Sequence, residues 1–506
     1  MFSQPAHGQK SSPPEWTSVH TRSSGTGRGK KLCLVADASA ATHQLAKNFA
    51  ADGWVVTLLD LGGTESPPIK GITHVRLAGQ YRETQWYIPV QSLCAYHWLC
   101  DKDFDLIVFH RGFGAGHYPC RARHLGLAFK DTPIVVWIPE PHTQKMESAA
   151  QFPETYADFE RDFMERETIA GADAVICAET SALWMEQAGW RWPAHMALQD
   201  EKADIPWSQW AENFTPPARI DAPEIFISVC LATHNRPDFL REALRSLETQ
   251  TYARFEVIVI DDGSTDSGVE SVRADYAPTF KKRSWRWEKQ ENTGPSPARN
   301  RAANMADGDY LLFMDDDNIA CADELERMAL AAQSGADILT CMMGVHDGSA
   351  MSSPPLAYLP ARNGEVLPLG WMPLGNAIDL APFVNRMGDT NSLFRREPFL
   401  KLGGFQGDRA MIFEDFDLFL RASLAGYRID VIPEILVLYR RNHSSRSMGP
   451  TIFTSHLQSL KPLLAQLPPF MRYALPALRR DWYQRHNHRR ESAGFQEIGI
   501  KTQYLL

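Results

Sequence analysis

The chain has 506 residues, of which 44% are hydrophobic and 22% charged, and its formal net charge at pH 7 is −9. This length exceeds one ordinary hydrophobic core, so we expect two or three domains. The composition is typical of a soluble globular protein. The negative charge argues against nucleic acid as the main partner, because phosphate backbones are bound by basic surfaces.

The eight cysteines form no CxxC pair and no short cysteine-rich module. Several of them, such as Cys33, Cys177 and Cys230, lie in strand-like apolar runs, which favours free core thiols over a disulfide framework. The first 30 residues lack an apolar signal core, and no segment has the roughly 18 apolar residues that cross a bilayer. These features predict a cytoplasmic protein.

Residues 1–29 are rich in Ser, Pro and Gly and lack periodicity, which predicts a disordered tail. A strand at 32–36, a helix at 40–52 and a strand at 54–61 then predict a βαβ unit. Alternating elements continue along the chain. We expect further strands at 104–110, 133–138 and 173–177, and helices at 154–170 and 180–189.

This alternation predicts a Rossmann-like, doubly wound parallel sheet over residues 30–202. The pattern resembles one Rossmann half of a GT-B glycosyltransferase, most clearly at 172–180. A complete GT-B enzyme needs two facing Rossmann domains, and only one precedes the proline-rich segment at 203–223, which we interpret as a linker. The first domain is therefore expected to be non-catalytic or to bind an acceptor.

Three features of this first domain have an ordinary and a functional interpretation. The glycine run 112–116 could let a phosphate approach the backbone, but a flexible loop is the more frequent meaning of such a run. Glu140, His142 and His117 lack the spacing of metal ligands. Loop or core roles are expected for all three.

In the second predicted domain, residues 224–450, two buried strands end in acidic residues. The strand 255–260 is followed by Asp261 and Asp262, and the strand 310–314 by Asp315, Asp316 and Asp317. Open α/β sheets bind ligands beyond the carboxyl ends of their strands, so these acids are expected to face a ligand.

Three adjacent carboxylates repel one another unless a cation or donor groups compensate. Such oxygen ligands suit Mg²⁺ or Mn²⁺, which keep coordination positions for substrate phosphates. The alternative is a solvated acidic turn that caps the following helix.

Five motifs in order resemble the family 2 glycosyltransferases, which have the GT-A fold and use nucleotide-sugars. The motifs are 228–236, 259–266, 292–294 with 298–300, 313–317, and 414–418. The resemblance covers about residues 225–445. It implies an inverting, metal-dependent transfer of a sugar from a nucleotide-diphospho-sugar, most often a uridine one in this family, to an acceptor hydroxyl.

The resemblance also implies the donor-binding residues. Asp317 is expected to be the direct ligand of Mn²⁺ or Mg²⁺, and the further metal ligands implied are Asp315 and His443. The implied nucleotide-binding residues are Thr233, Asn235, Asp262, Arg299, Asp315 and Asp316.

Two of these residues have alternatives. A carboxylate after a strand can stabilise a turn, a role that we give to Asp261 or Asp266 rather than Asp262. Arg299 could equally be a surface arginine on the helix that follows Pro297.

The resemblance places the catalytic general base at Asp415, with Glu414 beside it, at the start of a helix expected over 414–424. Partial burial beside Glu414 would raise the pKa of Asp415 and make it a better base. Capping of the helix by the same two acids is the alternative. A pure binding protein needs no such base, so the pair favours an enzyme.

Two further segments flank this chemistry. Residues 351–382 are rich in Pro and Gly without periodicity, which predicts an irregular loop that shapes the acceptor site. Residues 451–506 predict a helical, basic extension. We favour a helix packed on the catalytic domain with a solvated basic face over a peripheral contact with the inner face of the membrane. Its arginines are Arg472, Arg479, Arg480, Arg485, Arg489 and Arg490.

The sequence as a whole predicts a glycosyltransferase that acts on a glycan or lipid-linked acceptor in the synthesis of a cell-surface polysaccharide or glycoconjugate. One alternative is a non-catalytic protein that binds nucleotide-sugars or glycans on the same fold. A sugar nucleotidyltransferase would need a glycine-rich triphosphate loop, which residues 232–235 do not provide.

Overall fold

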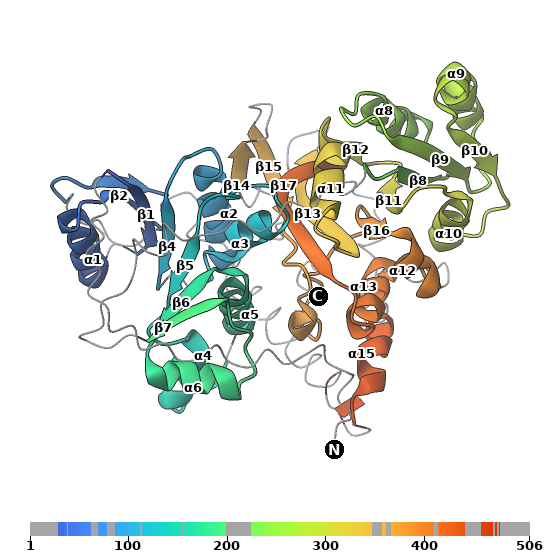
Figure 1. Cartoon of the computed structure of the whole chain (residues 1–506). Helices are drawn as coiled ribbons and strands as arrows, with labels where there is room; N and C mark the ends of the chain where they lie inside the picture. Colours follow the sequence, from blue (N-terminus) through green and yellow to red (C-terminus); the bar gives the residue numbers. More distant parts are fainter. Residues whose placement is uncertain are drawn as a thin grey trace, which may run out of the picture. The chain divides into compact units, whose positions relative to one another are not determined.

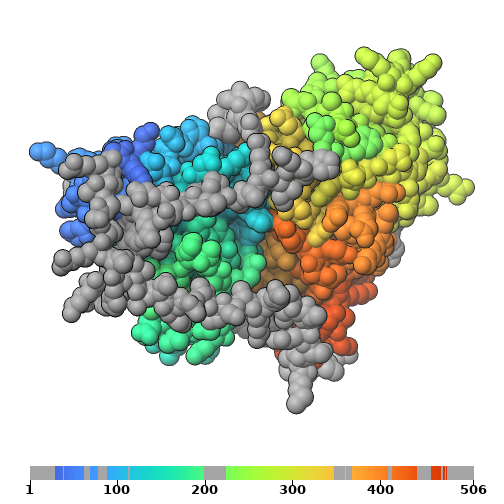
Figure 2. Space-filling view, viewed as in Figure 1, coloured from blue at the N-terminus to red at the C-terminus, as the bar shows by residue number. Residues whose placement is uncertain are grey.

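The computed structural model describes residues 29–198 and 224–475 apart from eleven gaps. The gaps are 38, 62–68, 78–86, 112–113, 154, 347–356, 361–365, 408–412, 441–456, 469–470 and 473–474. The chain divides into two compact units between residues 219 and 220, and Figure 2 colours their described residues from blue to green and from green to red. The predicted tail (except Gly29), the predicted linker and most of the predicted C-terminal extension lie outside the described residues.

The N-terminal unit is built on a seven-stranded sheet in which every neighbouring pair is parallel (Figure 1). The strand order is β3-β2-β1-β4-β5-β6-β7, so the direction of winding reverses between β1 and β4. This confirms the predicted doubly wound sheet. Its strands are β1 (Lys31–Ala36), β2 (Val55–Asp60), β3 (Thr73–Arg76), β4 (Leu106–His110), β5 (Ile134–Trp137), β6 (Ala174–Cys177) and β7 (His195–Leu198).

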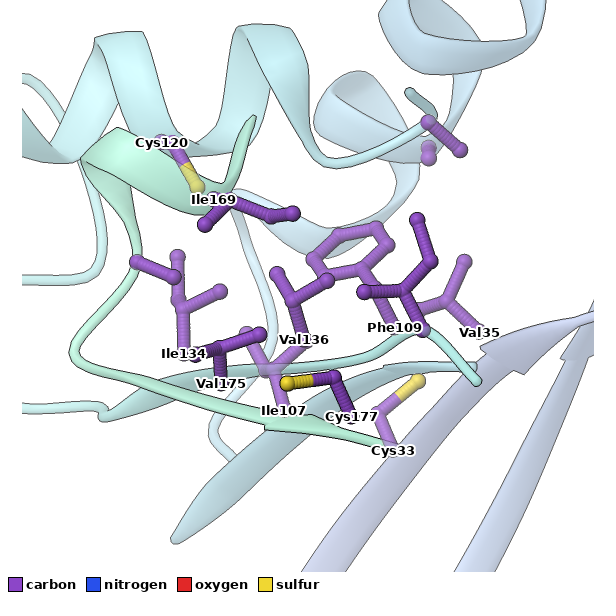
Figure 3. Packing of buried hydrophobic residues seen from close by; sticks show 14 of the residues in the cluster. Cys33, Val35, Ile107, Phe109, Cys120, Ile134, Val136, Ile169, Val175 and Cys177 are labelled. Carbon is purple, nitrogen blue, oxygen red and sulfur yellow. The ribbon is translucent and has the colours of Figure 1, made fainter. Parts of the chain in front are cut away.

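Each face of this sheet has its own hydrophobic core, because successive side chains of a strand point to opposite faces. In β1, Leu32 and Leu34 pack with α1, whereas Cys33 and Val35 pack on the other face. Figure 3 shows that second core, in which Phe109 and Ile169 are labelled. The helices are α1 (Ala40–Ala51), α2 (Tyr87–Leu99), α3 (His117–His124), α4 (His142–Ser148), α5 (Tyr156–Gly171) and α6 (Glu179–Gln187).

All eight cysteines are free thiols, as predicted. Cys33, Cys120 and Cys177 lie in the core of Figure 3. Burial disfavours the thiolate and raises the pKa of Cys120 and of Cys177 to about 12. These side chains therefore behave as small apolar groups at neutral pH.

Two described glycines of the run 112–116, which follows β4, allow the loop to pack closely against its neighbours. A Cβ on Gly114 would lie 2.6 Å from Cβ of Met164, and a Cβ on Gly116 would lie 2.6 Å from Cγ2 of Thr168. Both contacts are with α5, so these glycines let the loop lie directly against that helix. Gly112 and Phe113 lie outside the described residues.

The C-terminal unit contains a ten-stranded mixed sheet (Figure 1). Its main path runs β10-β9-β8-β11-β16-β13-β15-β14, with β17 paired to β12 and β13. The strands are β8 (Ile227–Thr233), β9 (Phe255–Asp261), β10 (Arg286–Lys289), β11 (Tyr310–Asp315), β12 (Ile319–Ala320), β13 (Ile338–His346), β14 (Ala357–Pro360), β15 (Val366–Trp371), β16 (Leu393–Arg395) and β17 (Ile429–Arg440). The four strands β8 to β11 are parallel to their neighbours within this group, whereas β16 runs antiparallel to β11.

The amphipathic pattern is clearest in helix α8, whereas α9 buries few apolar side chains. Helix α8 begins with a proline at its first position and buries Leu240, Leu244 and Leu247 at helical spacing. The helices are α8 (Pro237–Glu248), α9 (Ser267–Arg283), α10 (Pro295–Met305), α11 (Glu324–Ala332), α12 (Arg396–Lys401), α13 (Glu414–Leu424) and α15 (Lys461–Gln466), with a 3₁₀ turn η1 (Ile378–Leu380).

The prediction of an irregular stretch at 351–382 is wrong for the strands β14 and β15, which form an antiparallel pair. Prolines obscure the strand pattern in the sequence. Pro360 ends β14, and Pro368 of β15 lies opposite Tyr358. Strand β14 is at the edge of the sheet, where a missing N–H donor is tolerated.

Within the part of the chain that the structure describes, every helix is too short or too polar to cross a bilayer.

Candidate active site

The predicted donor-binding residues meet at the carboxyl ends of three neighbouring parallel strands. Thr233 at the end of β8 lies opposite Asp261 at the end of β9, and Asp315 at the end of β11 lies opposite Ala232. The structure therefore brings Thr233, Asp262 and the three aspartates of residues 315–317 to one edge of the sheet. This is where open α/β sheets bind ligands.

The three adjacent aspartates are compensated by donor groups of the protein itself. Asp316 is buried and accepts hydrogen bonds from Oγ1 of Thr233 (2.7 Å) and Nη1 of Arg236 (3.1 Å). The same nitrogen of Arg236 donates to Asp317 at 3.0 Å. Burial raises the pKa of Asp317 to about 7, the charges of Asp315 and Asp316 act in the same direction, and Arg236 opposes them.

Arg299 of α10 links the aspartates to the predicted catalytic pair. Its Nη2 donates to Asp315 at 2.5 Å and its Nη1 donates to Glu414 at 2.7 Å. Burial alone would lower the pKa of Arg299, but the charges of Asp315 and Glu414 outweigh burial and raise it above its usual range. The alternative of a surface arginine is wrong, since only 6% of this residue is exposed.

Glu414 and Asp415 begin α13, and the structure gives them different surroundings. Glu414 is held by Arg299. The carboxylate of Asp415 accepts one hydrogen bond within the described residues, from the backbone N–H of Phe416 at 2.7 Å. Burial raises the pKa of Asp415 well above its usual range, and the charges of Glu414 and Asp389 act in the same direction. The N–H of Phe416 belongs to the first turn of α13, so Asp415 also contributes to the start of the helix.

Two of the predicted nucleotide-binding residues, Asp262 and Asn235, accept hydrogen bonds from neighbouring loops of the protein. Asp262 accepts from the backbone N–H groups of Thr293 (2.9 Å) and Gly294 (2.8 Å) and from the side chain of Gln290 (2.8 Å). Asn235, with a left-handed φ of 54°, accepts from two N–H groups of residues 265–266. These residues shape the loops of the site, and their contact with a nucleotide stays a prediction.

The turn-stabilising roles given to the neighbouring acids fit the structure. Asp261 accepts from the N–H of Ser264 at 2.8 Å, and Asp266 caps α9 by accepting from the N–H of Gly268 at 2.8 Å. Between them, Gly263 has a φ of 75°, and a Cβ there would lie 2.7 Å from the backbone nitrogen of Asn292. Only glycine fits this turn without displacing the loop that carries Asn292.

Sequence reasoning missed two residues of the site, Arg236 and Asp389. Arg236 lies three residues after the end of β8, in the loop beyond the strand end where the acids also lie, and this position marks it in the sequence. Asp389 follows no predicted strand, so no local pattern marks it. Burial raises the pKa of Asp389 to about 7, and the charge of Asp315 acts in the same direction.

A buried pair supports the turn that carries Asp389. Glu324 at the start of α11 is fully buried and accepts a hydrogen bond of 2.7 Å from Nδ2 of Asn391. Burial raises the pKa of Glu324 from 4.5 to about 8. Glu324 is therefore protonated in the folded protein at neutral pH.

We expect Glu324→Gln to reduce the loss of stability that accompanies a rise in pH. Between pH 4.5 and about 8 the unfolded chain releases the Glu324 proton and the folded chain retains it, so the free energy of unfolding falls as pH rises through this window. Glutamine keeps an acceptor for Asn391 and has no proton to release. Urea unfolding at pH 5 and pH 8 measures the difference, and an unchanged pH slope in the variant would contradict the assignment.

The donor set fits a divalent cation that is bound together with substrate phosphates. Asp315 and Asp317 supply carboxylate oxygens at the strand end, with 32% and 16% of their side chains exposed. In the described ranges no three His, Cys, Asp or Glu side chains gather into a preformed metal cage. Mg²⁺ is commonly held by one or two carboxylates plus phosphates, which is what these residues offer. His443 lies outside the described residues.

The C-terminal unit is thus an α/β unit whose acidic residues gather at the carboxyl ends of neighbouring parallel strands. The model of the family "Glycosyl transferase family 2" matches residues 228–403. The match confirms the resemblance to this family over the first four of the five motifs, whereas the fifth, 414–418, lies beyond the matched residues.

Curated relatives match parts of the chain. The uncharacterized glycosyltransferase YibD of Escherichia coli is 36% identical over 116 residues, which cover 23% of this chain and 33% of YibD. An uncharacterized glycosyltransferase of Methanocaldococcus jannaschii is 26% identical over 226 residues, covering 42% of this chain and 70% of the relative. The chain therefore spans only a third of the length of YibD.

Solved structures with similar chains include TarS of S. aureus in complex with UDP-GlcNAc. It shares 18% identity over 50% of this chain and 71% of the solved chain, TarS 1–349, with a TM-score of 0.37. A mannosyltransferase of Pyrobaculum calidifontis in complex with GDP-Man and Mn²⁺ shares 18% identity over 54% of this chain and 74% of its own, with a TM-score of 0.36.

Proposed function

We propose that the C-terminal unit is an inverting, metal-dependent glycosyltransferase that moves a sugar from a nucleotide-diphospho-sugar to an acceptor hydroxyl. The observation that carries the proposal is the bridge made by Arg299. One buried guanidinium contacts Asp315, on the side expected to bind the donor phosphates, and Glu414, next to the expected base. Groups for both halves of a transfer reaction thus lie within reach of a single side chain.

On the donor side, Asp317 and Asp315 would hold Mn²⁺ or Mg²⁺, which when bound supplies positive charge to the diphosphate leaving group. Arg236 lies at the same strand end and hydrogen-bonds Asp316 and Asp317. Its guanidinium is partly exposed and would add positive charge beside the phosphates of a bound donor. Thr233, Asn235 and Asp262 fix the loops over which the nucleotide would lie.

On the acceptor side, Asp415 accepts the proton of the acceptor hydroxyl. The hydroxyl oxygen attacks the anomeric carbon, the bond from that carbon to the diphosphate oxygen breaks, and the nucleoside diphosphate leaves with the bonding electrons. One direct displacement inverts the anomeric configuration. The raised pKa of Asp415 suits this role, because a carboxylate with a higher pKa is a stronger base.

The wider setting follows from the same proposal. We infer a uridine nucleotide-sugar as donor, a glycan or lipid-linked acceptor, and a role in cell-surface polysaccharide synthesis in the cytoplasm. The N-terminal unit would be non-catalytic. Its described residues form one seven-stranded parallel sheet, whereas a GT-B enzyme needs two facing Rossmann domains.

A screen of nucleotide-sugars tests the function most directly. The full chain is unfolded thermally with UDP-, GDP- and TDP-sugars, with and without Mn²⁺, because a ligand that binds only the folded state raises the unfolding temperature. Release of nucleoside diphosphate is measured in parallel. Stabilisation without any turnover of donor on a panel of acceptors would favour the alternative, a non-catalytic nucleotide-sugar or glycan-binding protein.

The N-terminal unit is tested in the full chain carrying both Asp317→Ala and Asp415→Asn. We expect no sugar transfer from this double variant, since the catalytic groups of the C-terminal unit are removed and the N-terminal unit is intact. Transfer is measured as the release of nucleoside diphosphate. Transfer that persists would show a second catalytic site and overturn the non-catalytic assignment.

Arg299→Ala is expected to lower the free energy of unfolding by about 3–5 kcal/mol, because it leaves Asp315 and Glu414 without their shared buried counter-ion. The matched control is Arg301→Ala on the same helix. Arg301 has 40% of its side chain exposed and pairs with Glu288 at 3.4 Å, so its loss should change stability by only about 0.5 kcal/mol. Equal effects of the two substitutions in urea unfolding would show that the bridge is not a structural link.

A further inference from the structure

The guanidinium of Arg299, which bridges Asp315 and Glu414, has one N–H group that these ion pairs do not use. Its Nε atom is buried and has no hydrogen-bond partner among the described residues. A buried donor without an acceptor costs free energy, so another favourable contact is expected there. The ring of Phe405 gives one to the guanidinium, because Cζ of Arg299 lies over this ring, 5.4 Å from its centroid. That distance is within the range of cation–π attraction.

Asn300, the next residue of α10, holds the backbone of Phe405. Its side-chain amide donates from Nδ2 to the carbonyl of Phe405 at 2.8 Å and accepts the N–H of Phe405 at Oδ1, at 2.9 Å. A Cβ on Gly404 would collide with Oδ1 of Asn300, so glycine lets the amide approach this closely. Because Asn300 follows Arg299 on one helix, the amide ties the ring to the helix that carries the guanidinium.

Helix α13, which carries the expected base at its start, holds the same turn, residues 402–405. Arg421 of this helix donates from its two Nη atoms to the carbonyls of Leu402 and Gly404, each at 2.8 Å. Its Nε donates to Asp417 at 2.7 Å, which fixes the guanidinium on its own helix. The turn 402–405 is therefore hydrogen-bonded both to α10 and to α13.

A cluster of buried aromatic rings surrounds Phe405. The members of this aromatic cluster are Phe313, Phe394, Phe399 and Phe405. The ring centroid of Phe405 lies 4.8 Å from that of Phe313, which belongs to β11, and 5.6 Å from that of Phe399, which belongs to α12. Among the described residues, Phe405 is the member of the cluster over which the guanidinium of Arg299 lies. Phe399 thus has similar packing without that contact.

We propose that Phe405 and Asn300 are positioning residues for the transfer reaction. Asn300 fixes the backbone of Phe405, whose ring then holds the guanidinium of Arg299 in its place. The inference rests on the proposed function of the C-terminal unit and adds to it two residues that act through another side chain. A guanidinium held in one position keeps the donor side and the acceptor side of the site in a fixed relation, and such preorganised charge and orientation lower the barrier of a transfer.

The experiment compares Phe405→Leu with Phe399→Leu in the full chain. Each variant removes one buried ring from the aromatic cluster, so both should lower the unfolding temperature by similar amounts. Only Phe405→Leu removes the ring under Arg299. We expect it to lower kcat about tenfold, the effect of losing a desolvated cation–π contact, and to leave the KM for the donor within about twofold. Phe399→Leu should keep kcat within about twofold. Steady-state release of nucleoside diphosphate measures both constants.

Asn300→Ala tests the second positioning residue. It should lower kcat about as much as Phe405→Leu, because the ring is no longer tied to α10. The double variant Asn300→Ala, Phe405→Leu should lose no more than the more damaged single variant, since both changes remove the same placement of Arg299. Losses in kcat that multiply in the double variant would show two independent effects and contradict the proposed link.

A spectrum of the arginine side chains gives a readout that needs no transfer activity. The buried Nε–H of Arg299 should give a slowly exchanging ¹H–¹⁵N signal, which Phe405→Leu and Asn300→Ala shift through the changed ring current and Phe399→Leu leaves in place. Absence of transfer by the unaltered chain would overturn the proposed function and this inference with it. Equal losses of kcat in the two leucine variants, or an Nε–H signal that does not respond to Phe405→Leu, would overturn the inference alone.

Discussion

Asp317→Ala is expected to abolish metal-dependent binding of nucleoside diphosphate by the full chain. Asp317 provides carboxylate oxygens at the end of β11, where 16% of its side chain is exposed. Without it the diphosphate charge loses the counter-ion that the site would hold, since Mg²⁺ and Mn²⁺ are commonly bound by one or two carboxylates plus phosphates. Calorimetric titration of UDP and GDP with and without Mn²⁺ measures the loss.

Folding should survive this substitution, because Arg236 keeps its contact with Asp316 when Asp317 is removed. The matched control is Asp275→Ala. It removes an exposed carboxylate of α9 that pairs with Arg241 of α8 at 2.7 Å. The control should bind nucleotide as the unaltered chain does. Undiminished Mn²⁺-dependent binding by Asp317→Ala would show that the metal is held elsewhere.

The sequence predicts most of the parallel strands and the helices with strong apolar periodicity. Strands β8, β9 and β11 are continuous apolar runs, and α8 places leucines at helical spacing, so local pattern and fold agree. Helix α9 escapes this reasoning because it buries few apolar side chains, Val269, Val272 and Phe280, and contains Pro278. Its start is nevertheless marked in the sequence by Asp266, which caps the helix.

The candidate site is predictable where residues follow strand ends and unpredictable where distant segments meet. Thr233 and the aspartates of residues 315–317 share an edge because neighbouring parallel strands end together. Arg299 and Glu414 are separated by 115 residues, and only the fold shows that they pair. Asp389 reaches the site through a turn supported by Asn391 and Glu324, contacts that no local pattern encodes.

Asp415→Asn is expected to reduce the rate of sugar transfer by about 10²–10⁴, the usual contribution of a general base. Asparagine has nearly the same volume and can still accept the N–H of Phe416, the bond that Asp415 makes in the structure. Folding and donor binding should therefore be retained. Loss of a helix cap, in contrast, costs about 1 kcal/mol of stability and leaves the chemistry intact. Single-turnover transfer rates and thermal unfolding separate the two roles.

The neighbouring acids provide the comparison that fixes the identity of the base. Asp417 accepts from Nε of Arg421 at 2.7 Å, and Glu414 is bound to Arg299, so each already has a cationic partner. A carboxylate whose oxygens are engaged by a guanidinium is less free to contact an acceptor hydroxyl. Asp417→Asn should therefore keep most of the transfer rate. If Asp415→Asn transfers sugar as fast as the unaltered chain, the base is Glu414 or Asp417. The variant with the larger reduction in transfer rate, Glu414→Gln or Asp417→Asn, then identifies it.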